Sequence, residues 1–191
     1  TIRPNPKGKK GAALQLDGDE LTLITLALNG ESLKEPAFIL TDTNLTIQDV
    51  PAQPFTLSLK TRLDPDHNTK LMGLYRSSGT YCTQCEAEGF RRITYFIDRP
   101  DVMSIYTTRI EARKDEAPIL LGNGNPQESG DLPDGFHYSV WHDPHPKPAY
   151  LFALVGGRLD SLKQDFVTRS GKSVQLAIYV EPGKTERARY A

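Results

Sequence analysis

Apolar and polar residues alternate with a period of two through most of the chain, a pattern typical of half-buried antiparallel strands. Between Leu21 and Leu28 the alternation changes phase at Ile24–Thr25, which predicts a strand with a bulge or a kink. Asn29–Gly30 follows and predicts a tight turn. Further segments with strand character lie at residues 38–40, 45–47, 55–59, 93–97, 107–112, 119–121, 138–141, 150–155 and 174–180. No long amphipathic helix is indicated, so the pattern predicts an all-β antiparallel sandwich.

Some segments carry more specific expectations. Residues 93–97 are rich in β-branched and aromatic side chains and predict a strand, whereas residues 98–101 offer a cap and a proline for a short helix. Residues 150–155 are apolar throughout, which predicts a strand buried on both faces. The prolines of residues 143–148 predict an extended loop. The strand expected at residues 174–180 follows a glycine break and could open a new domain.

The length and charge of the chain limit the number of domains and the classes of binding partner. At 191 residues and 21.3 kDa, the chain can form one domain, or one domain and a fragment of another. Its formal net charge of -1 gives no electrostatic basis for binding nucleic acid or an anionic membrane surface. It has no apolar run of the roughly 20 residues needed to span a membrane and no signal-peptide pattern, so we expect a soluble protein. Because the chain begins at Thr1, we also expect a trimmed product, although removal of an initiator methionine would leave the same start.

Cys82 and Cys85 are the only cysteines, and they have C-x-x-C spacing. A structural zinc site needs four ligands, and a redox pair is expected to open a helix after a strand. Neither context is visible in the sequence, which favours two ordinary reduced thiols over a zinc or redox role. Reduced thiols indicate a cytoplasmic location.

His137, His142 and His145, with Asp143 between the last two, are the local candidates for metal ligands. The neighbouring prolines extend the chain, so His142 and His145 need not point to the same side. Surface or packing histidines are therefore the favoured interpretation.

The densest group of functional side chains lies in the segment T-Q-C-E-A-E-G-F-R, residues 83–91. In an extended conformation Gln84, Glu86 and Glu88 would share one face and offer an amide and two carboxylates to a protonated amine. The chain has no H-E-x-x-H zinc helix and no nucleophile paired with a base. The alternative is a solvated edge, or structural ion pairs with nearby arginines, namely Arg91, Arg92 or Arg99.

Several longer sequence segments resemble the same protein family. They are LYRSSG at residues 74–79, CTQCEAEGFR at 82–91, ITYFIDRPDV at 93–102, LGNGN at 121–125, WHDPHPKPAYLFALV at 141–155 and TRSG at 168–171. Together they closely resemble the aminopeptidase N family of zinc metallopeptidases, particularly its bacterial branch. The similarity covers nearly the whole chain.

The resemblance implies a domain organisation. Residues 1–158 would form the saddle-shaped N-terminal β domain, without its first strands, and residues 159–191 would begin the thermolysin-like catalytic domain. The family's G-A-M-E-N motif and its H-E-x-x-H zinc helix lie downstream. Zinc would therefore belong to the parent enzyme, with no ligand in this segment, and the segment alone would be inactive.

The resemblance also implies a role for individual residues. The positions of Gln84 and Glu86 match the family's glutamine and glutamate that hold the free α-amino group of the substrate, whereas Glu88 is assigned no substrate contact. The partners would be peptides with a free N-terminus and the enzyme's own catalytic domain. A free-standing β-sandwich that binds or scaffolds without catalysis is the alternative function.

Overall fold

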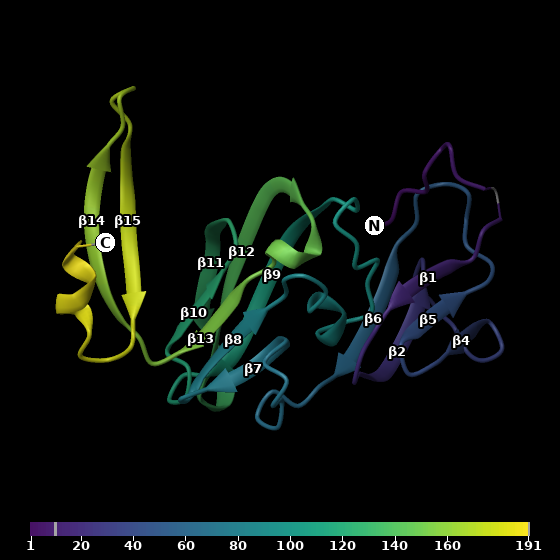
Figure 1. The fold of residues 1–191 in the computed structure, drawn as a ribbon, viewed down its shortest axis with the longest axis horizontal. Helices are drawn as coiled ribbons and strands as arrows, with labels where there is room; N and C mark the ends of the chain where they lie inside the picture. Colours follow the sequence, from purple (N-terminus) through teal and green to yellow (C-terminus); the bar gives the residue numbers. More distant parts are fainter. Residues whose placement is uncertain (10, 191) are drawn as a thin grey trace. The chain divides into compact units, whose positions relative to one another are not determined.

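The computed structural model describes residues 1–9 and 11–190, and nearly all of its regular structure is antiparallel strand (Figure 1), which confirms the all-β prediction. The strands are β1 (Leu14–Asp17), β2 (Thr22–Leu28), β3 (Glu31–Ser32), β4 (Phe38–Leu40), β5 (Asn44–Ile47), β6 (Leu57–Arg62), β7 (Gly73–Ser77), β8 (Thr80–Gln84), β9 (Ser104–Arg113), β10 (Ile119–Gly122), β11 (Asn125–Asp131), β12 (Phe136–Lys147), β13 (Leu154–Gly157), β14 (Asp160–Val167) and β15 (Ser173–Val180). Short 3-10 helices are η1 (Phe90–Arg92), η2 (Pro133–Gly135), η3 (Ala149–Leu151) and η4 (Thr185–Tyr190). Within the described residues, no helix has the length and apolar character required to cross a membrane.

The chain forms two compact units, which are described separately. Unit 1 contains residues 1–76, 82–106 and 143–153, and unit 2 contains residues 77–81, 107–142 and those from 154 onward. Each unit has buried side chains of its own.

Unit 1 contains two three-stranded sheets, with strand orders β1-β5-β4 and β3-β2-β6. The pairing of β2 with β6 shifts register between Leu23 and Thr25, which confirms the predicted bulge at Ile24. Asn29 and Gly30 have φ values of 50° and 89° between β2 and β3, which confirms the predicted turn. Glycine suits this position because positive φ carries no Cβ penalty there. The core of these sheets consists of five buried residues, Leu16, Leu26, Leu45, Ile47 and Tyr95.

The prediction of a strand at residues 93–97 was wrong. This segment makes only a single bridge, in which the backbone groups of Asp17 and Phe96 exchange hydrogen bonds of 2.7 and 3.0 Å. Its aromatic residues divide between two clusters, since Tyr95 joins the core of the sheets and Phe96 packs on a second cluster around Phe90. The segment of residues 93–97 therefore packs its side chains into two clusters and does not form the strand hydrogen bonds that its composition suggested. The short helix expected at residues 98–101 is instead a turn, closed by the Val102 N–H donating to the Arg99 carbonyl at 3.2 Å.

Unit 2 has a small core of its own, formed by Ile110, Ala117 and Leu120. Its strands include the antiparallel pair β10–β13 and the order β11-β12-β9.

The sequence predictions for residues 143–148 and 150–155 need correction. The proline-rich stretch is largely the end of strand β12, because proline keeps an extended φ and sacrifices only ladder N–H groups. Residues 150–155 do not form one buried strand, since η3 occupies their start and Leu151 is 49% exposed.

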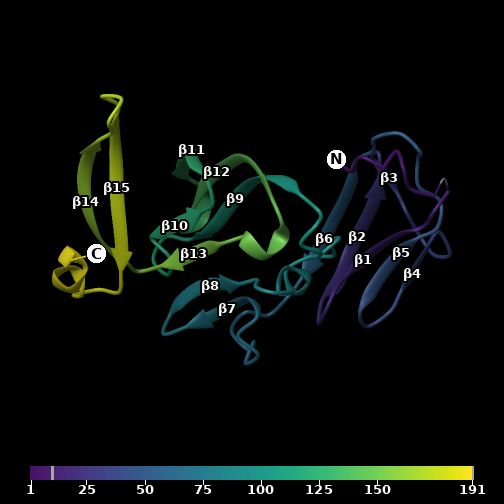
Figure 2. The ribbon, with the colours of Figure 1, turned by 45° about the horizontal axis from the view of Figure 1, so that its top comes forward.

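The strand predicted at residues 174–180 is confirmed as β15, and it pairs with β14 over their full length. Figures 1 and 2 show these two strands as a long hairpin with η4 beside it. The register places six apolar side chains on one face, Leu162, Phe166, Val174, Leu176, Ile178 and Val180. We call this set the hairpin face. Two of its members, Phe166 and Leu176, are 54% and 46% exposed.

Candidate functional site

Strand β8 ends at Gln84, and the chain then turns through residues Cys85–Gly89, which we call the acidic turn. The Gly89 N–H donates to the Cys85 carbonyl at 2.8 Å, and η1 follows at once. The peptide between Glu86 and Ala87 is cis. A Cβ atom at Gly89 would lie 2.3 Å from the Gln84 carbonyl oxygen, so the closure of the turn requires glycine at this position. The predicted extended conformation therefore holds as far as Gln84 and is wrong beyond it.

The three predicted side chains are nevertheless all exposed to solvent, Gln84 at the end of β8 and Glu86 and Glu88 in the turn. Glu88 lies 3.4 Å from Arg91 Nη1, which is the structural ion pair considered as the alternative for this segment. Gln84 Nε2 donates to the backbone oxygen of Glu86 at 3.4 Å. Among the described residues, the Glu86 carboxylate has no ion-pair partner. Glu86 is therefore available to bind a cationic group.

The acidic turn stands on a buried apolar base. Cys85 is 2% exposed, and Phe90, directly after the turn, is 6% exposed. The Phe90 ring makes edge contacts with Phe96, Phe152 and Tyr106 at centroid distances of 4.9, 5.0 and 6.0 Å. Such aromatic pairs add roughly 0.5–1.5 kcal/mol each beyond the burial of their surface. Both ends of the turn are thus anchored in the interior of unit 1.

Asp98 lies beside the site and contacts Arg91, a connection that the sequence does not predict. It is 3% exposed, and its carboxylate oxygen Oδ2 accepts hydrogen bonds from the Arg91 backbone N–H and from Arg91 Nε, both at 3.1 Å. The Asp98 backbone oxygen accepts a further bond from Arg91 Nη2 at 3.1 Å. From the sequence, Asp98 was interpreted only as a helix cap. No local pattern links it to Arg91, which lies seven residues earlier.

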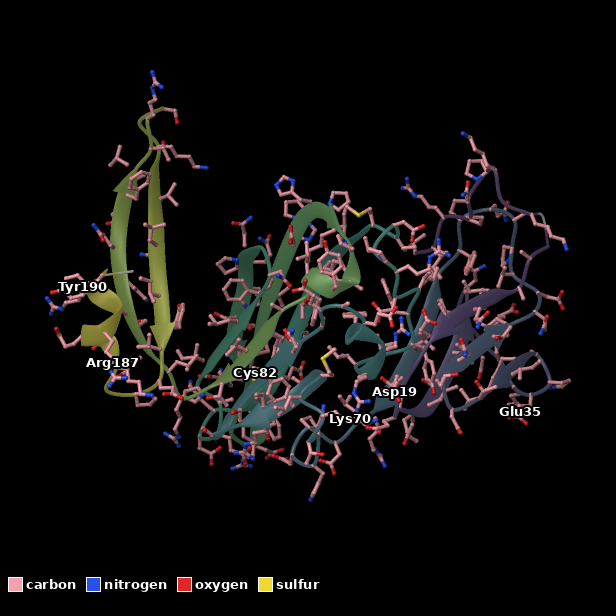
Figure 3. All side chains as sticks on the ribbon, in the orientation of Figure 1. Asp19, Glu35, Lys70, Cys82, Arg187 and Tyr190 are labelled. Carbon is pink, nitrogen blue, oxygen red and sulfur yellow. The ribbon has the colours of Figure 1, made fainter. Side chains whose placement is uncertain are left out.

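The neighbouring Arg92 pairs with acidic residues between β1 and β2 and not with the acidic turn. Its guanidinium is 7% exposed and contacts the carboxylates of Asp19 and Glu20, and Lys70 Nζ lies 2.5 Å from Glu20. Figure 3 labels Asp19 and Lys70 in this region. Lys70 first, and then Arg92, lower the pKa of the Glu20 carboxyl by hydrogen bonding to its charged form. This network ties the β1–β2 connection to η1 and leaves the acidic turn without an arginine partner from Arg92.

The cysteines of the C-x-x-C pair occupy different environments. Both are free thiols, with Cys82 half-buried within β8 and Cys85 buried at the start of the acidic turn. Burial raises the pKa of the Cys85 thiol to about 12, and the nearby charge of Asp98 raises it further. Cys85 is consequently protonated at neutral pH and acts as a small apolar packing residue.

The histidines are each hydrogen bonded within the fold. His137 Nε2 lies 2.7 Å from the Ala117 carbonyl oxygen, and His142 Nδ1 lies 2.8 Å from Thr107 Oγ1. His145 is exposed, and its backbone N–H donates to Asp143 Oδ1 at 3.2 Å. In the part of the chain that the structure describes, three or more His, Cys, Asp or Glu side chains nowhere gather as a metal site.

These features define an all-β domain that presents an acidic turn on an aromatic base. The family model of the Peptidase M1 N-terminal domain matches residues 15–151. The chain belongs to this family, as the sequence resemblance predicted.

Curated relatives of the chain are aminopeptidases. Aminopeptidase N of Caulobacter vibrioides is 50% identical over 184 residues, and aminopeptidase N of Escherichia coli K12 is 46% identical over 184 residues. Each alignment covers 96% of this chain and 21% of the relative. The chain therefore spans about a fifth of the length of these relatives.

Solved structures agree with this assignment. Legionella pneumophila aminopeptidase A, crystallised in complex with aspartic acid, superposes with a TM-score of 0.93 at 38% identity, covering 98% of this chain and 22% of that one. An M1 zinc metallopeptidase from Deinococcus radiodurans, bound to a Tyr-Ser-Ala substrate, has a TM-score of 0.72 at 18% identity and covers 92% of this chain and 44% of that one. The second likeness is one of fold alone.

Proposed function

We propose that this chain is the N-terminal domain of a zinc-dependent aminopeptidase that removes N-terminal amino acids from peptides, and that Gln84 and Glu86 bind the free α-amino group of the substrate. The observation that carries the proposal is the exposed Glu86 carboxylate, which has no ion-pair partner among the described residues. It stands on a turn whose first residue, Cys85, and whose following residue, Phe90, are buried. The family membership and the relatives named aminopeptidase N support the same function.

The chemistry of recognition follows from the groups present. A substrate ammonium has three N–H donors, and the Glu86 carboxylate is a charged acceptor for them. Because the Gln84 amide nitrogen donates to the Glu86 backbone, the amide oxygen is left as a second, neutral acceptor. A charge-assisted hydrogen bond of this kind contributes about 1.5–3 kcal/mol. Binding the amine would fix the chain end of the peptide and so define which peptide bond is presented for cleavage.

The residues described here do not fit a zinc site, since no group of three or more suitable ligands gathers among them. In this proposal zinc is held by the part of the whole protein outside this chain, and this chain contributes recognition and one wall of the substrate pocket. We further propose a cytoplasmic location, which the two free thiols support.

The hairpin β14–β15 supports the domain boundary, with residues 1–158 as the N-terminal β domain and residues 159–191 as the opening of the catalytic domain. The family match ends at residue 151, and β14 and β15 contact chiefly each other and η4.

An isolated two-stranded hairpin is marginally stable, and the apolar hairpin face is partly exposed. We propose that chain following Ala191 covers this face, because the relatives are almost five times longer. An H-E-x-x-H motif encoded there would support the enzyme, whereas a stop codon would favour the free-standing module.

Replacing Glu86 by alanine in the whole protein tests the amine-binding role. We expect kcat/KM for an amino-acid anilide to fall about 10- to 150-fold with the zinc content unchanged, because a contact of about 1.5–3 kcal/mol is lost. Gln84→Ala should cost less, since its contact is neutral. The matched control is Glu111→Ala, which removes an exposed glutamate of β9 paired with Arg109 at 2.6 Å. Wild-type kcat/KM in the fully zinc-loaded Glu86 variant would contradict the assignment.

A further inference from the structure

We propose that Asp98 is a positioning residue for the acidic turn, and that it acts through Arg91 to fix where Gln84 and Glu86 stand. The inference rests on the proposed function and adds a residue that does not itself touch the substrate. Asp98 has a side chain that is only 2% exposed, and it holds both the backbone and the side chain of Arg91. Arg91 lies two residues after the last residue of the acidic turn, so a restraint on Arg91 is a restraint on the exit of the turn.

The hydrogen bonds of Arg91 hold its backbone from two directions. Its N–H donates to the Asp98 carboxylate at 3.1 Å, and its carbonyl oxygen accepts from the Asp19 N–H at 3.0 Å. Asp98 is itself fixed, because its N–H donates to Asp17 Oδ2 at 3.2 Å at the end of β1. The exit of the acidic turn is thereby tied to a strand of the core sheet.

The arginine side chain continues the connection back to the turn. Arg91 Nη1 lies 3.4 Å from Glu88, which is two residues after Glu86. Strand β8 fixes the entry of the turn at Gln84, and the Arg91–Asp98 pair fixes its exit. Loss of the Asp98 charge would release the exit while the entry stays in place, and the side chain between them, Glu86, would lose its defined position.

A second arginine–aspartate pair in the same segment provides a control. Arg99 bonds Asp101 through Nε at 2.9 Å and Nη2 at 2.5 Å, but both side chains are more than 60% exposed, and among the described residues neither forms a salt bridge with the acidic turn. Substitutions at Asp98 and Asp101 remove the same charge at positions three residues apart. Only the buried pair is connected to the turn.

The test is a double-mutant cycle in the whole protein, with the hydrolysis of an amino-acid anilide as the assay. We expect Asp98→Asn to raise KM and to lower kcat/KM about fivefold or more in the wild-type background, and to have little effect when Glu86→Gln is already present. Asp101→Asn should leave kcat/KM unchanged in both backgrounds. A purely structural role predicts the same fold-loss with and without Glu86→Gln, and that result would overturn the proposal.

Because removing a buried acceptor can prevent folding, Arg91→Lys is the second variant. It keeps the positive charge but loses the paired donation to Asp98, and it should show the same dependence on Glu86. Failure of both variants to fold, with Asp101→Asn folding normally, would overturn the proposal in favour of a structural role. A Glu86→Gln variant with wild-type kcat/KM would instead reject the proposed function, and the inference with it.

Discussion

The acidic turn and the β14–β15 hairpin leave opposite kinds of surface exposed. At the acidic turn and the residues on either side of it, the apolar side chains of Cys85 and Phe90 are buried and the polar side chains of Gln84 and Glu86 face solvent. In the hairpin, Phe166 and Leu176 are about half exposed although they lie on the apolar side of the pair. The residues at both ends of the turn are packed within unit 1, whereas the hairpin contacts chiefly η4 and leaves part of its apolar face uncovered.

The comparison separates two reasons for exposure. A carboxylate on a well-packed support costs little to keep in water and stays available for a cationic ligand. An apolar face in water forgoes about 25 cal/mol for each Å² that a partner could cover. We therefore interpret the acidic turn as a surface for a small charged group and the hairpin face as a surface for another part of a protein.

The reactivity of Cys85 tests how tightly the turn is closed. With a pKa of about 12, its thiolate is rarer at pH 8 than that of a free cysteine by about a thousandfold or more. We expect iodoacetamide to modify Cys85 slower than an unfolded thiol by at least that factor, with the rate rising as the pH rises. Mass spectrometry of a Cys82→Ser variant gives the rate, and the same variant unfolded in urea is the reference. Rapid modification in the folded state would show that the turn opens readily.

The stability of the two regions should differ when an aromatic side chain is removed from each. Phe90→Ala deletes a buried ring with three aromatic neighbours, and we expect a loss of about 3–5 kcal/mol in the free energy of unfolding. Phe166→Ala removes a ring that is 54% exposed and should cost less than about 1 kcal/mol. Urea denaturation followed by circular dichroism measures both. Equal losses would contradict the view that only the turn is fully packed.

The parts of the fold that the sequence predicted correctly depend on local pattern. The bulge at Ile24, the turn at Asn29–Gly30 and the strand β15 follow from the phase of alternation and from turn chemistry, both readable within a few residues. Residues 93–97 were assigned wrongly because their composition suits a strand. Tyr95 and Phe96 instead fill two separate cores, and this arrangement depends on partners far away in the sequence.

The residues of the candidate site also separate into those that the sequence could predict and those that it could not. Family resemblance selected Gln84 and Glu86, and the pairing of Glu88 with a nearby arginine was available from i,i+3 spacing. The Asp98–Arg91 pair could not be predicted, because it depends on a turn after η1 that brings residue 98 back to residue 91. The sequence suggested an extended acidic segment and could not show that Gly89 closes a turn against the Gln84 carbonyl.

The smallest expected effect concerns the hairpin face itself. In the isolated chain, an uncovered apolar face should promote self-association, and Leu176→Lys places a charge at its centre, opposite Gln164. Because Leu176 is already 46% exposed, the free energy of unfolding should change by less than about 1 kcal/mol, while the sedimentation coefficient at high concentration should fall towards that of a monomer. The matched control is Ala177→Lys, which adds the same charge to an exposed position on the opposite face. If both variants reduce association equally, net charge and not the hairpin face governs self-association. If the unmodified chain is already monomeric, the hairpin face does not need the partner that we propose.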